Sequence, residues 1–311
     1  MRGKAINSFD LNLLKVFLAI WDMRNLTEAG EQLGLTQPAV SHSLRRLRDH
    51  FSDPLFTRSG TKMIPTETAM TLHPAFERAL QVVSHSIQQS AAFSPETSNR
   101  TFRLGMSDVS ELCFLPRLLA YMEKTAPMIR IESTEVDVET IDTKMRSGQV
   151  DAAIGYLPEL VNYKEALLTE DHFICLVRKH HPFRQDELSI ADLSGLTYVD
   201  SLQATGYRMI ARHLHLQGVR RSINARLAHF TVVPEIVRRT DMATLYPLTA
   251  AEIINADGAF RILSLPVTLP KIPINLYTHP NFSNDRGIQW LCEIVKNAAK
   301  STGGSGQGDV R

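Results

Sequence analysis

Residues 27–47 read TEAGEQLGLTQPAVSHSLRRL, and this segment constrains the fold more than any other part of the chain. Gly34 stands where two short helical patterns meet, at a turn where a positive φ is cheap only for glycine. Thr27 is expected to cap the first helix and Thr36 the second. Apolar residues at spacings of four and three should form the buried stripe of the second helix: Val40, Leu44 and Leu47. The pattern predicts a helix-turn-helix.

The outer face of the second helix carries polar and basic side chains, which are the types that read base edges and hold phosphates in DNA. The candidates for base contact are Gln37, Ser41, His42 and Arg45. Those for phosphate contact are Thr36, Arg46, Arg48, Arg58 and Lys62, with Pro38 in the first turn of the same surface. The alternative is an ordinary pair of amphipathic helices with a solvated face.

The flanking segments favour DNA binding over simple packing. Residues 11–23, with Asp10 as a cap, have the broad apolar face of a third helix, and residues 53–66 form two strand-like pieces around Ser59-Gly60, as in a hairpin wing. Residues 36–62 hold five basic and two acidic side chains, a local net charge of +3, whereas the whole chain carries +1. The positive charge is therefore concentrated where DNA contact is expected.

Length and composition indicate an ordinary soluble protein of two or three domains, with 311 residues, 43% hydrophobic and 22% charged. No apolar run approaches the ~18 residues of a membrane span, and the N-terminus does not resemble a signal peptide. Cys113, Cys175 and Cys292 lie far apart among apolar neighbours, so we expect free thiols in a reducing compartment, the cytoplasm. The Gly/Ser-rich tail, residues 301–311, is expected to be disordered.

A long helical stretch capped by Thr66 is expected over about residues 67–92, with Pro74 bending or breaking its early part. Its apolar residues repeat at three and four, as in a seam between helices. We interpret residues 67–93 as a linker helix for dimerisation, the alternative being an ordinary core helix. The proposed contact residues are Leu72, Phe76, Leu80, Val83 and Ile87.

Strands and helices alternate after residue 100, which predicts a parallel α/β sheet with helices on both faces. Strands are expected at 101–106, 128–136, 150–157, 173–179, 196–200, 222–228, 243–247, 260–266 and 273–279. Helices are expected at 111–124, 140–147, 207–217, 233–239, 249–255 and 286–300. So many strands indicate two lobes. The expected DNA-binding domain is 1–66, and the expected C-terminal domain, 101–300, has two lobes. Lobe I is formed by 101–160 with 274–300, and lobe II by 170–266. The chain is expected to cross between them near 156–170 and 266–275.

These segments, in this order, resemble a LysR-type transcriptional regulator. The most specific stretches are LGLTQPAVSHSLRRLRDHFSDPLF with the following PT, and GQVDAAIG. The stretches RTFRLGMSD, FLPRLL, RKHHP and HFTVVPEIVRRTD are similar to the branch that answers to salicylate and nitroaromatic compounds. The resemblance implies an N-terminal α-helical winged helix-turn-helix, a linker helix and a C-terminal α/β domain of two lobes like a periplasmic binding protein.

The same resemblance implies a function and a set of partners. The chain would bind double-stranded operator DNA as a homodimer or homotetramer, take a small-molecule inducer between its lobes and act on RNA polymerase, with no cofactor and no membrane. Gly30 stands where the family usually has alanine, which should cost ~1 kcal/mol of helix propensity. His42 occupies a variable position, and Tyr207 stands where salicylate-type relatives tend to have histidine.

An inducer site is expected where strands end and helices begin, because helix N-termini suit anions. Ser107 follows the first strand of this domain, and Thr205-Gly206 begins a helix in the other lobe, so a small, aromatic carboxylate is the expected ligand. Asp108 and Glu111 are awkward for an anion and indicate either a weak or partly hydrophobic ligand or a hydroxyl group facing that side. The full set of candidates is Ser107, Asp108, His172, Thr205, Gly206, Tyr207 and Phe230. Plain caps and core packing are the alternatives.

An enzyme or metal site is not supported, although the chain has 11 histidines. His213 and His215 are two apart on a predicted helix and so point away from each other. No Cys/His cluster has zinc spacing, and no Gly-x-Ser-x-Gly or phosphate-binding loop is present. The competing hypothesis from another class is a solute-binding or transport-associated protein with merely structural N-terminal helices.

Overall fold

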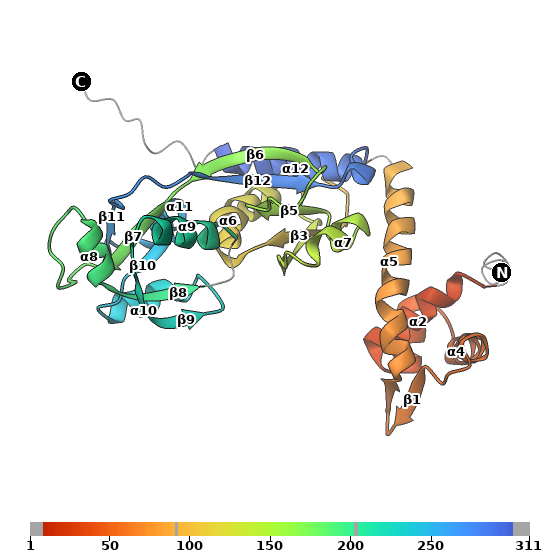
Figure 1. Cartoon of the computed structure of the whole chain (residues 1–311). Coiled ribbons are helices and arrows are strands. Elements are labelled where there is room, and N and C mark those ends of the chain that lie inside the picture. Colours follow the sequence, from red (N-terminus) through yellow and green to blue (C-terminus); the bar gives the residue numbers. More distant parts are fainter. Residues whose placement is uncertain (1–8, 91–92, 202–204, 301–311) are drawn as a thin grey trace. The chain divides into compact units, whose positions relative to one another are not determined.

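A computed structural model describes residues 9–90, 93–201 and 205–300, and the predictions for the tail and for the start of the chain concern residues outside these ranges. The chain divides into two compact units, one built on the residues up to Ser90 and the other on most of those that follow. The first contains helices α2 (Asn12–Met23), α3 (Leu26–Leu33) and α4 (Gln37–Phe51), strands β1 (Phe56–Ser59) and β2 (Lys62–Pro65), and helix α5 (Glu67–Ser90) (Figure 1).

The helix-turn-helix is confirmed, with one correction at its start. The cap of α3 is Asn25, whose side chain accepts a hydrogen bond from Thr27 N at 2.8 Å, so Thr27 already lies inside the helix. The reason is that Arg24 ends α2 in the left-handed region, at φ 54°, and leaves Asn25 extended before α3 begins. Gly34 turns the chain at φ 66°, as expected, and Thr36 precedes α4 without a side-chain cap.

The core of the first unit forms where the three helices meet. Val40, Leu44 and Leu47 are almost fully buried and pack with Phe17 and Ile20 of α2. Gly30 is also required here, because a Cβ built on it would lie 2.7 Å from Leu35 O. In this backbone an alanine would need the turn to move, so the glycine suits the close approach of the turn to α3.

Helix α5 starts where the sequence predicts, since Thr66 Oγ1 accepts a hydrogen bond from Ala69 N at 3.2 Å. The helix does not break at Pro74 and continues to Ser90. Leu72 and Phe76, on either side of the proline, pack against the core of the first unit, and this tertiary contact compensates for the hydrogen bond that proline cannot make.

The second unit contains a five-stranded sheet in the order β4-β3-β5-β12-β6. Its strands are β3 (Thr101–Met106), β4 (Arg130–Glu135), β5 (Ala152–Gly155), β6 (Lys164–Asp171) and β12 (Ile272–Thr278). Strand β3 is parallel to β4 and β5, but β12 is antiparallel to β5 and β6. The prediction of a parallel sheet is therefore wrong for β12, which runs opposite to the other four strands.

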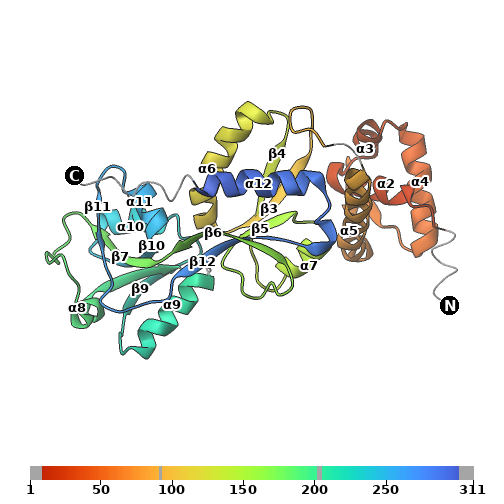
Figure 2. The ribbon, with the colours of Figure 1, turned by 90° about the horizontal axis from the view of Figure 1, so that it is seen from above.

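Helices cover both faces of this sheet. Helices α6 (Asp108–Thr125) and α12 (Arg286–Lys300) pack on one face, where Ala152 and Ile154 point, and α7 (Ile141–Arg146) packs on the other, where Ala153 points (Figure 2). Gly105 allows the close approach of α7, because a Cβ there would lie 2.9 Å from the Ile141 side chain. A short 3-10 helix, η1 (Pro280–Phe282), precedes α12.

The other lobe is built on two small sheets. Strands β10 (Thr244–Pro247), β7 (Phe173–Arg178) and β11 (Phe260–Leu263) form an antiparallel sheet, and β8 (Thr197–Ser201) and β9 (Ser222–Leu227) a parallel pair. A bridge between Tyr198 and Ala243 connects the two. Helices α8 (Ile190–Gly195), α9 (Thr205–Leu216), α10 (Val233–Arg239) and α11 (Leu248–Ile254) complete this lobe.

The sequence analysis did not predict helix α8, the short helix η1 or strand β6. The segment 156–170, expected as a crossover, contains most of β6, which pairs with β12 along its whole length. Its sequence, KEALLTED, has exposed charged residues at Lys164, Glu165 and Glu170 and lacks the apolar alternation of a buried strand. Strand β7 begins two residues after β6 ends, so one extended stretch runs from the first lobe into the second.

Candidate functional site

The predicted DNA-contact face of α4 is accessible. Gln37, Pro38, His42, Arg45 and Arg46 are exposed, as is Thr36 just before the helix. Gln37 Nε2 donates to Ser41 Oγ at 2.9 Å, which orders the two polar side chains at the start of the helix. Such a face offers donors and acceptors to base edges without moving the core beneath it.

Two of the arginines assigned to phosphates have intramolecular partners. Arg46 Nη1 lies 2.8 Å from Asp10 Oδ2, in an exposed ion pair. Arg48 Nε donates to Pro54 O at 2.8 Å and Nη2 to Phe56 O at 2.7 Å. The guanidinium of Arg48 thus holds the segment between α4 and β1. This positions the wing, and the assignment of Arg48 to phosphate contact stays a prediction.

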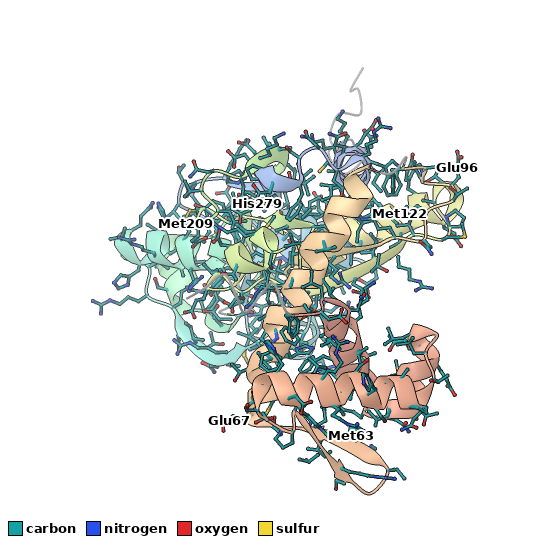
Figure 3. All side chains as sticks on the ribbon, turned by 90° about the vertical axis from the view of Figure 1, so that its right-hand side faces the viewer. Met63, Glu67, Glu96, Met122, Met209 and His279 are labelled. Carbon is teal, nitrogen blue, oxygen red and sulfur yellow. The ribbon has the colours of Figure 1, made fainter. Side chains whose placement is uncertain are left out.

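The wing is a hairpin, as predicted, with Ser59 opposite Lys62 and Gly60 at φ 63°. The second strand of the hairpin, β2, buries Met63 and is followed by α5, which begins at Glu67; both residues are labelled in Figure 3. Arg58 and Lys62 are exposed at the tip, and Arg58 Nε donates to Gly60 O at 3.1 Å. These positions suit contact with the DNA backbone or the minor groove.

Asp53 fixes the base of the wing, a role that sequence reasoning did not assign. Its Oδ1 accepts from Leu55 N and Thr66 Oγ1, and its Oδ2 from Thr68 Oγ1, each at 2.7 Å. These hydrogen bonds, with those from Thr66 and Thr68 the strongest, hold the pKa of Asp53 below its usual value. Leu55 is fully buried at φ 55°, a strained backbone that this carboxylate supports.

The second unit has a cavity of about 100 Å³, here called the cleft. Its walls come from both lobes: the start of α6, the end of β5, the stretch from β6 to β7, and the starts of α9 and α11. Most of its lining is apolar. The lining residues with polar side chains are Ser107, Ser110, Cys113, Tyr156, Thr169, Asp171, Tyr207 and Thr249.

Three of the predicted effector residues line the cleft: Ser107, Gly206 and Tyr207. Ser107 Oγ accepts from Ser110 N at 3.2 Å, so it caps α6, and it also lies 3.1 Å from Ser110 Oγ. Thr205 begins α9, but its side chain lies outside the described residues.

Tyr207 presents its ring to the cleft and its hydroxyl elsewhere. Arg221 Nη1 donates to Tyr207 Oη at 2.7 Å and lies 3.0 Å from Asp200 Oδ1, in a buried cluster. Burial raises the pKa of Tyr207, and the nearby Arg221 only partly opposes this. The phenol therefore stays neutral and is occupied, so this residue offers the cleft an apolar surface.

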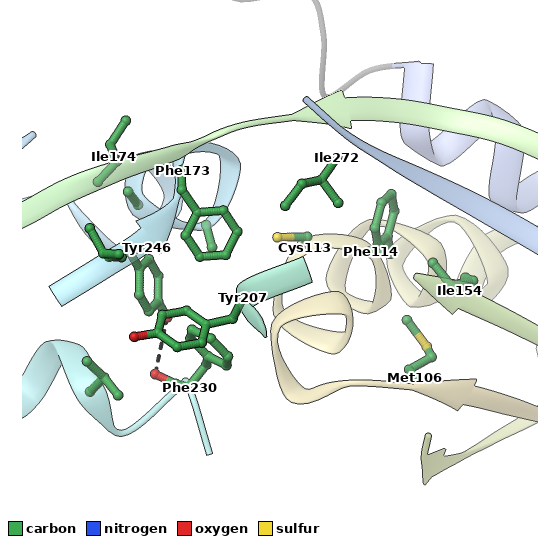
Figure 4. Packing of buried hydrophobic residues seen from close by; sticks show 14 of the residues in the cluster. Met106, Cys113, Phe114, Ile154, Phe173, Ile174, Tyr207, Phe230, Tyr246 and Ile272 are labelled. Atoms are coloured by element: carbon green, nitrogen blue, oxygen red, sulfur yellow. Dashed lines mark hydrogen bonds between the residues drawn. The ribbon is translucent and has the colours of Figure 1, made fainter. Parts of the chain in front are cut away.

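His172 and Phe230 do not line the cleft, and both assignments are corrected. Side chains alternate along a strand, so Asp171 and Phe173 point into the cleft while His172 between them is exposed. Phe230 is buried, with its ring centroid 5.6 Å from that of Tyr207 and 6.0 Å from that of Tyr246 (Figure 4). It is a core residue behind the cleft wall.

Asp108 links the two lobes and is not part of the cleft lining. Its Oδ2 accepts hydrogen bonds from Thr231 N at 2.8 Å and Thr231 Oγ1 at 3.1 Å, while Oδ1 accepts from Val109 N. Asp108 belongs to α6 in the first lobe and Thr231 to the loop before α10 in the second. The carboxylate therefore favours the closed arrangement of the lobes.

Replacing Asp108 by alanine should weaken this closure. A hydrogen bond to a charged group contributes about 1.5–3 kcal/mol when it is shielded from water and less when it is not. Because the Thr231 amide would lose this bond, we expect its exchange with solvent to become roughly tenfold faster. Hydrogen–deuterium exchange of the full chain measures this directly. The matched control is Asp257→Ala, which removes an exposed carboxylate that bonds only within the second lobe. Equal exchange at Thr231 in both variants would contradict the assignment.

Within the described residues, no group of three His, Cys, Asp or Glu side chains comes together as a metal site would need. The three cysteines are free, as predicted, and burial, with a smaller contribution from Asp171, raises the pKa of Cys113 in the cleft wall to about 12. None of the helices in this part of the chain is long and apolar enough to cross a membrane.

Comparison with known families decides what this arrangement is. Residues 11–70 match the model of the bacterial regulatory helix-turn-helix protein, lysR family, and residues 95–300 match the LysR substrate binding domain. The chain belongs to the LysR family. It is a DNA-binding transcriptional regulator with a C-terminal effector-binding domain, and the alternative of a solute-binding protein with structural N-terminal helices is not favoured.

Relatives of this LysR-type regulator cover nearly its whole length. The HTH-type transcriptional activator NahR of Pseudomonas putida is 34% identical over 292 residues, which are 93% of this chain and 97% of NahR. A transcriptional regulator from Pseudomonas aeruginosa has a similar crystal structure, with a TM-score of 0.76, 25% identity, and coverage of 94% of this chain and 98% of that one. CbnR in complex with its target DNA shares the fold, with a TM-score of 0.64, 14% identity, and coverage of 94% and 100%.

Proposed function

We propose that this LysR-type regulator binds operator DNA through α4 and the wing, and that a small molecule in the cleft changes this binding. The observation that carries the proposal is the cleft itself, because its walls come from both lobes. A ligand there contacts both lobes only when they are closed, and it can shift the balance between open and closed forms by that difference in affinity.

The effector is proposed to be a single-ring compound with an acceptor group, such as an aromatic carboxylate. The first turn of α6 has Ser107 and Ser110 in the cleft wall, and the positive end of a helix dipole suits such a group. NahR, a transcriptional activator, is similar over almost the whole chain, which supports a regulator of this kind. We further propose that the chain acts in the cytoplasm and on RNA polymerase, and has no catalytic role.

A thermal-shift screen of the full chain tests the cleft as an effector site. A ligand at about 100 times its Kd should stabilise the protein by about 2.7 kcal/mol, and the melting transition should rise accordingly. Gel shifts on DNA upstream of the gene should then change with the same compounds. If no single-ring compound among carboxylates, amides, phenols and amines stabilises the chain, the effector proposal is wrong.

We propose that the chain assembles as a dimer, and as a tetramer of two dimers, through the later part of α5. The stripe of apolar residues predicted for the dimer contact falls into two groups. Leu72 and Phe76 pack against the core of their own unit, whereas Leu80 is half-buried outside that core and Val83 is exposed. The side chain of Ile87 lies outside the described residues. The free part of the stripe is therefore the surface that a second copy would cover.

Leu80→Asp should disrupt this assembly, because it places an unpaired charge in an apolar contact. Sedimentation velocity of the full chain should give the monomer mass, with loss of operator binding. Ala79→Asp is the control, since Ala79 is exposed beside Leu80 and points elsewhere on the helix. A Leu80→Asp protein with the mass of the wild type would show that α5 does not carry the dimer contact.

A further inference from the structure

Asp171 is the one carboxylate in the cleft lining of the described chain. It is the last residue of β6, and only 8% of it is exposed. Its Oδ1 accepts from His172 N at 2.7 Å and from Thr249 N at 3.3 Å. Within the described residues Oδ2 has no hydrogen-bond partner. We propose that Asp171 selects effectors that donate a hydrogen bond from an O–H or N–H group to this oxygen.

The surroundings of Asp171 leave its charge without a counterion. The described lining of the cleft includes no Lys, Arg or His side chain. The hydroxyl of Tyr156 points at Met209 Sδ, 3.6 Å away, and that of Tyr207 is held by Arg221. Asp171 Oδ2 is accessible to solvent, so a ligand that occupies the cleft beside it removes water from this oxygen. A ligand that supplies a donor replaces the lost hydrogen bond and therefore binds more tightly than one that leaves the oxygen without a partner.

The walls and the size of the cleft limit the rest of the ligand. The ring edge of Tyr207 and the side chains of Phe114, Phe173 and Ile272 give an apolar surround (Figure 4). The cleft has about 100 Å³, which is less than the apolar cavity of about 150 Å³ that holds one benzene ring in another protein, so its size limits the effector to one ring at most. The effector class is therefore a single ring with a hydroxyl or amine substituent that reaches Asp171. This inference rests on the proposed function and adds to it a requirement for a donor.

Matched ligands test the inference on the wild-type chain without any substitution. Benzoate and benzamide are each compared with their hydroxy and methoxy derivatives at all three ring positions, by calorimetry on the full protein. We expect that in at least one position the hydroxyl improves Kd about tenfold over the parent ring, and that methoxy at that position gives no such gain. A hydroxyl with no effect at every position, while the parent rings still bind, overturns the inference and leaves the proposed function standing.

Asp171→Asn separates a direct contact from a structural role. The amide oxygen can still accept from His172 N and Thr249 N, while the amide nitrogen replaces Oδ2 and turns an acceptor into a donor. We expect the advantage of hydroxyl over methoxy to disappear and the parent rings to bind as before or better. Asp241→Asn, the same change outside the cleft lining, should keep the wild-type preference. An Asp171→Asn protein that retains the hydroxyl preference would overturn the inference. If no ring binds to any of the proteins, the proposed effector function fails with it.

Discussion

Replacing Arg100 by leucine is expected to cost about 3–5 kcal/mol of the free energy of unfolding of the second unit, because it leaves buried carboxylates without their cation. Arg100 Nη1 lies 2.7 Å from Asp285 Oδ1, and Nη2 lies 3.3 Å from Asp151 Oδ1. The three side chains are between 1% and 8% exposed. Arg100 lies just before β3 and Asp151 just before β5, so the cluster joins the starts of these two strands. Asp285 adds the start of α12, because its Oδ1 accepts hydrogen bonds from Gly287 N and Ile288 N.

Denaturant unfolding followed by fluorescence measures this cost. The chain has two tryptophans, and Trp290 packs against Phe93 and Phe102 in the second unit, so a Trp21→Phe background reports on that unit alone. The control is Arg103→Leu, which breaks an ion pair with Glu132 whose side chains are 42% and 59% exposed and should cost less than ~1 kcal/mol. Equal costs for the two variants would contradict the role of the buried cluster.

Arg45→Ala is expected to weaken binding to the operator by ~1–3 kcal/mol, if Arg45 reads a base edge from the exposed face of α4. Binding to DNA of unrelated sequence should change much less. Arg58→Ala, at the tip of the wing, should instead weaken binding to all DNA and lower the salt dependence by roughly one unit. Fluorescence anisotropy at several salt concentrations distinguishes the two effects. Unchanged affinity in both variants would refute the assignment of the DNA-contact face.

Much of the fold could be predicted because local chemistry and burial agree there. In α4 a turn glycine, a first-turn proline and a stripe of three apolar residues all indicate the same helix, and the structure contains it. The helices Val233–Arg239 and Arg286–Lys300 also have the predicted bounds. Strand β6 was missed because an edge strand with several exposed charged residues lacks the alternation that periodicity detects.

The cleft was harder to predict because its residues meet only through tertiary contacts. Ser107 and Gly206 could be found, since each lies at a helix start, but Asp171 ends a strand that the sequence did not reveal. His172 was chosen in its place, and a shift of one residue on a strand turns a side chain to the opposite face. The sequence identified Asp108 and Arg48 as polar residues of interest but could not show what they bind. Their partners, Thr231 for Asp108 and the carbonyls of Pro54 and Phe56 for Arg48, come near them only in the folded chain.

The central claim is that α4 recognises an operator and that a ligand in the cleft changes that recognition. Footprinting of the full chain on DNA upstream of its own gene, with and without a ring compound that stabilises the protein, tests both parts at once. We predict a sequence-specific protected region that Arg45→Ala abolishes, and a change in its extent or pattern when the ligand is saturating. Protection without sequence preference, or the same footprint with and without saturating ligand, would contradict the account.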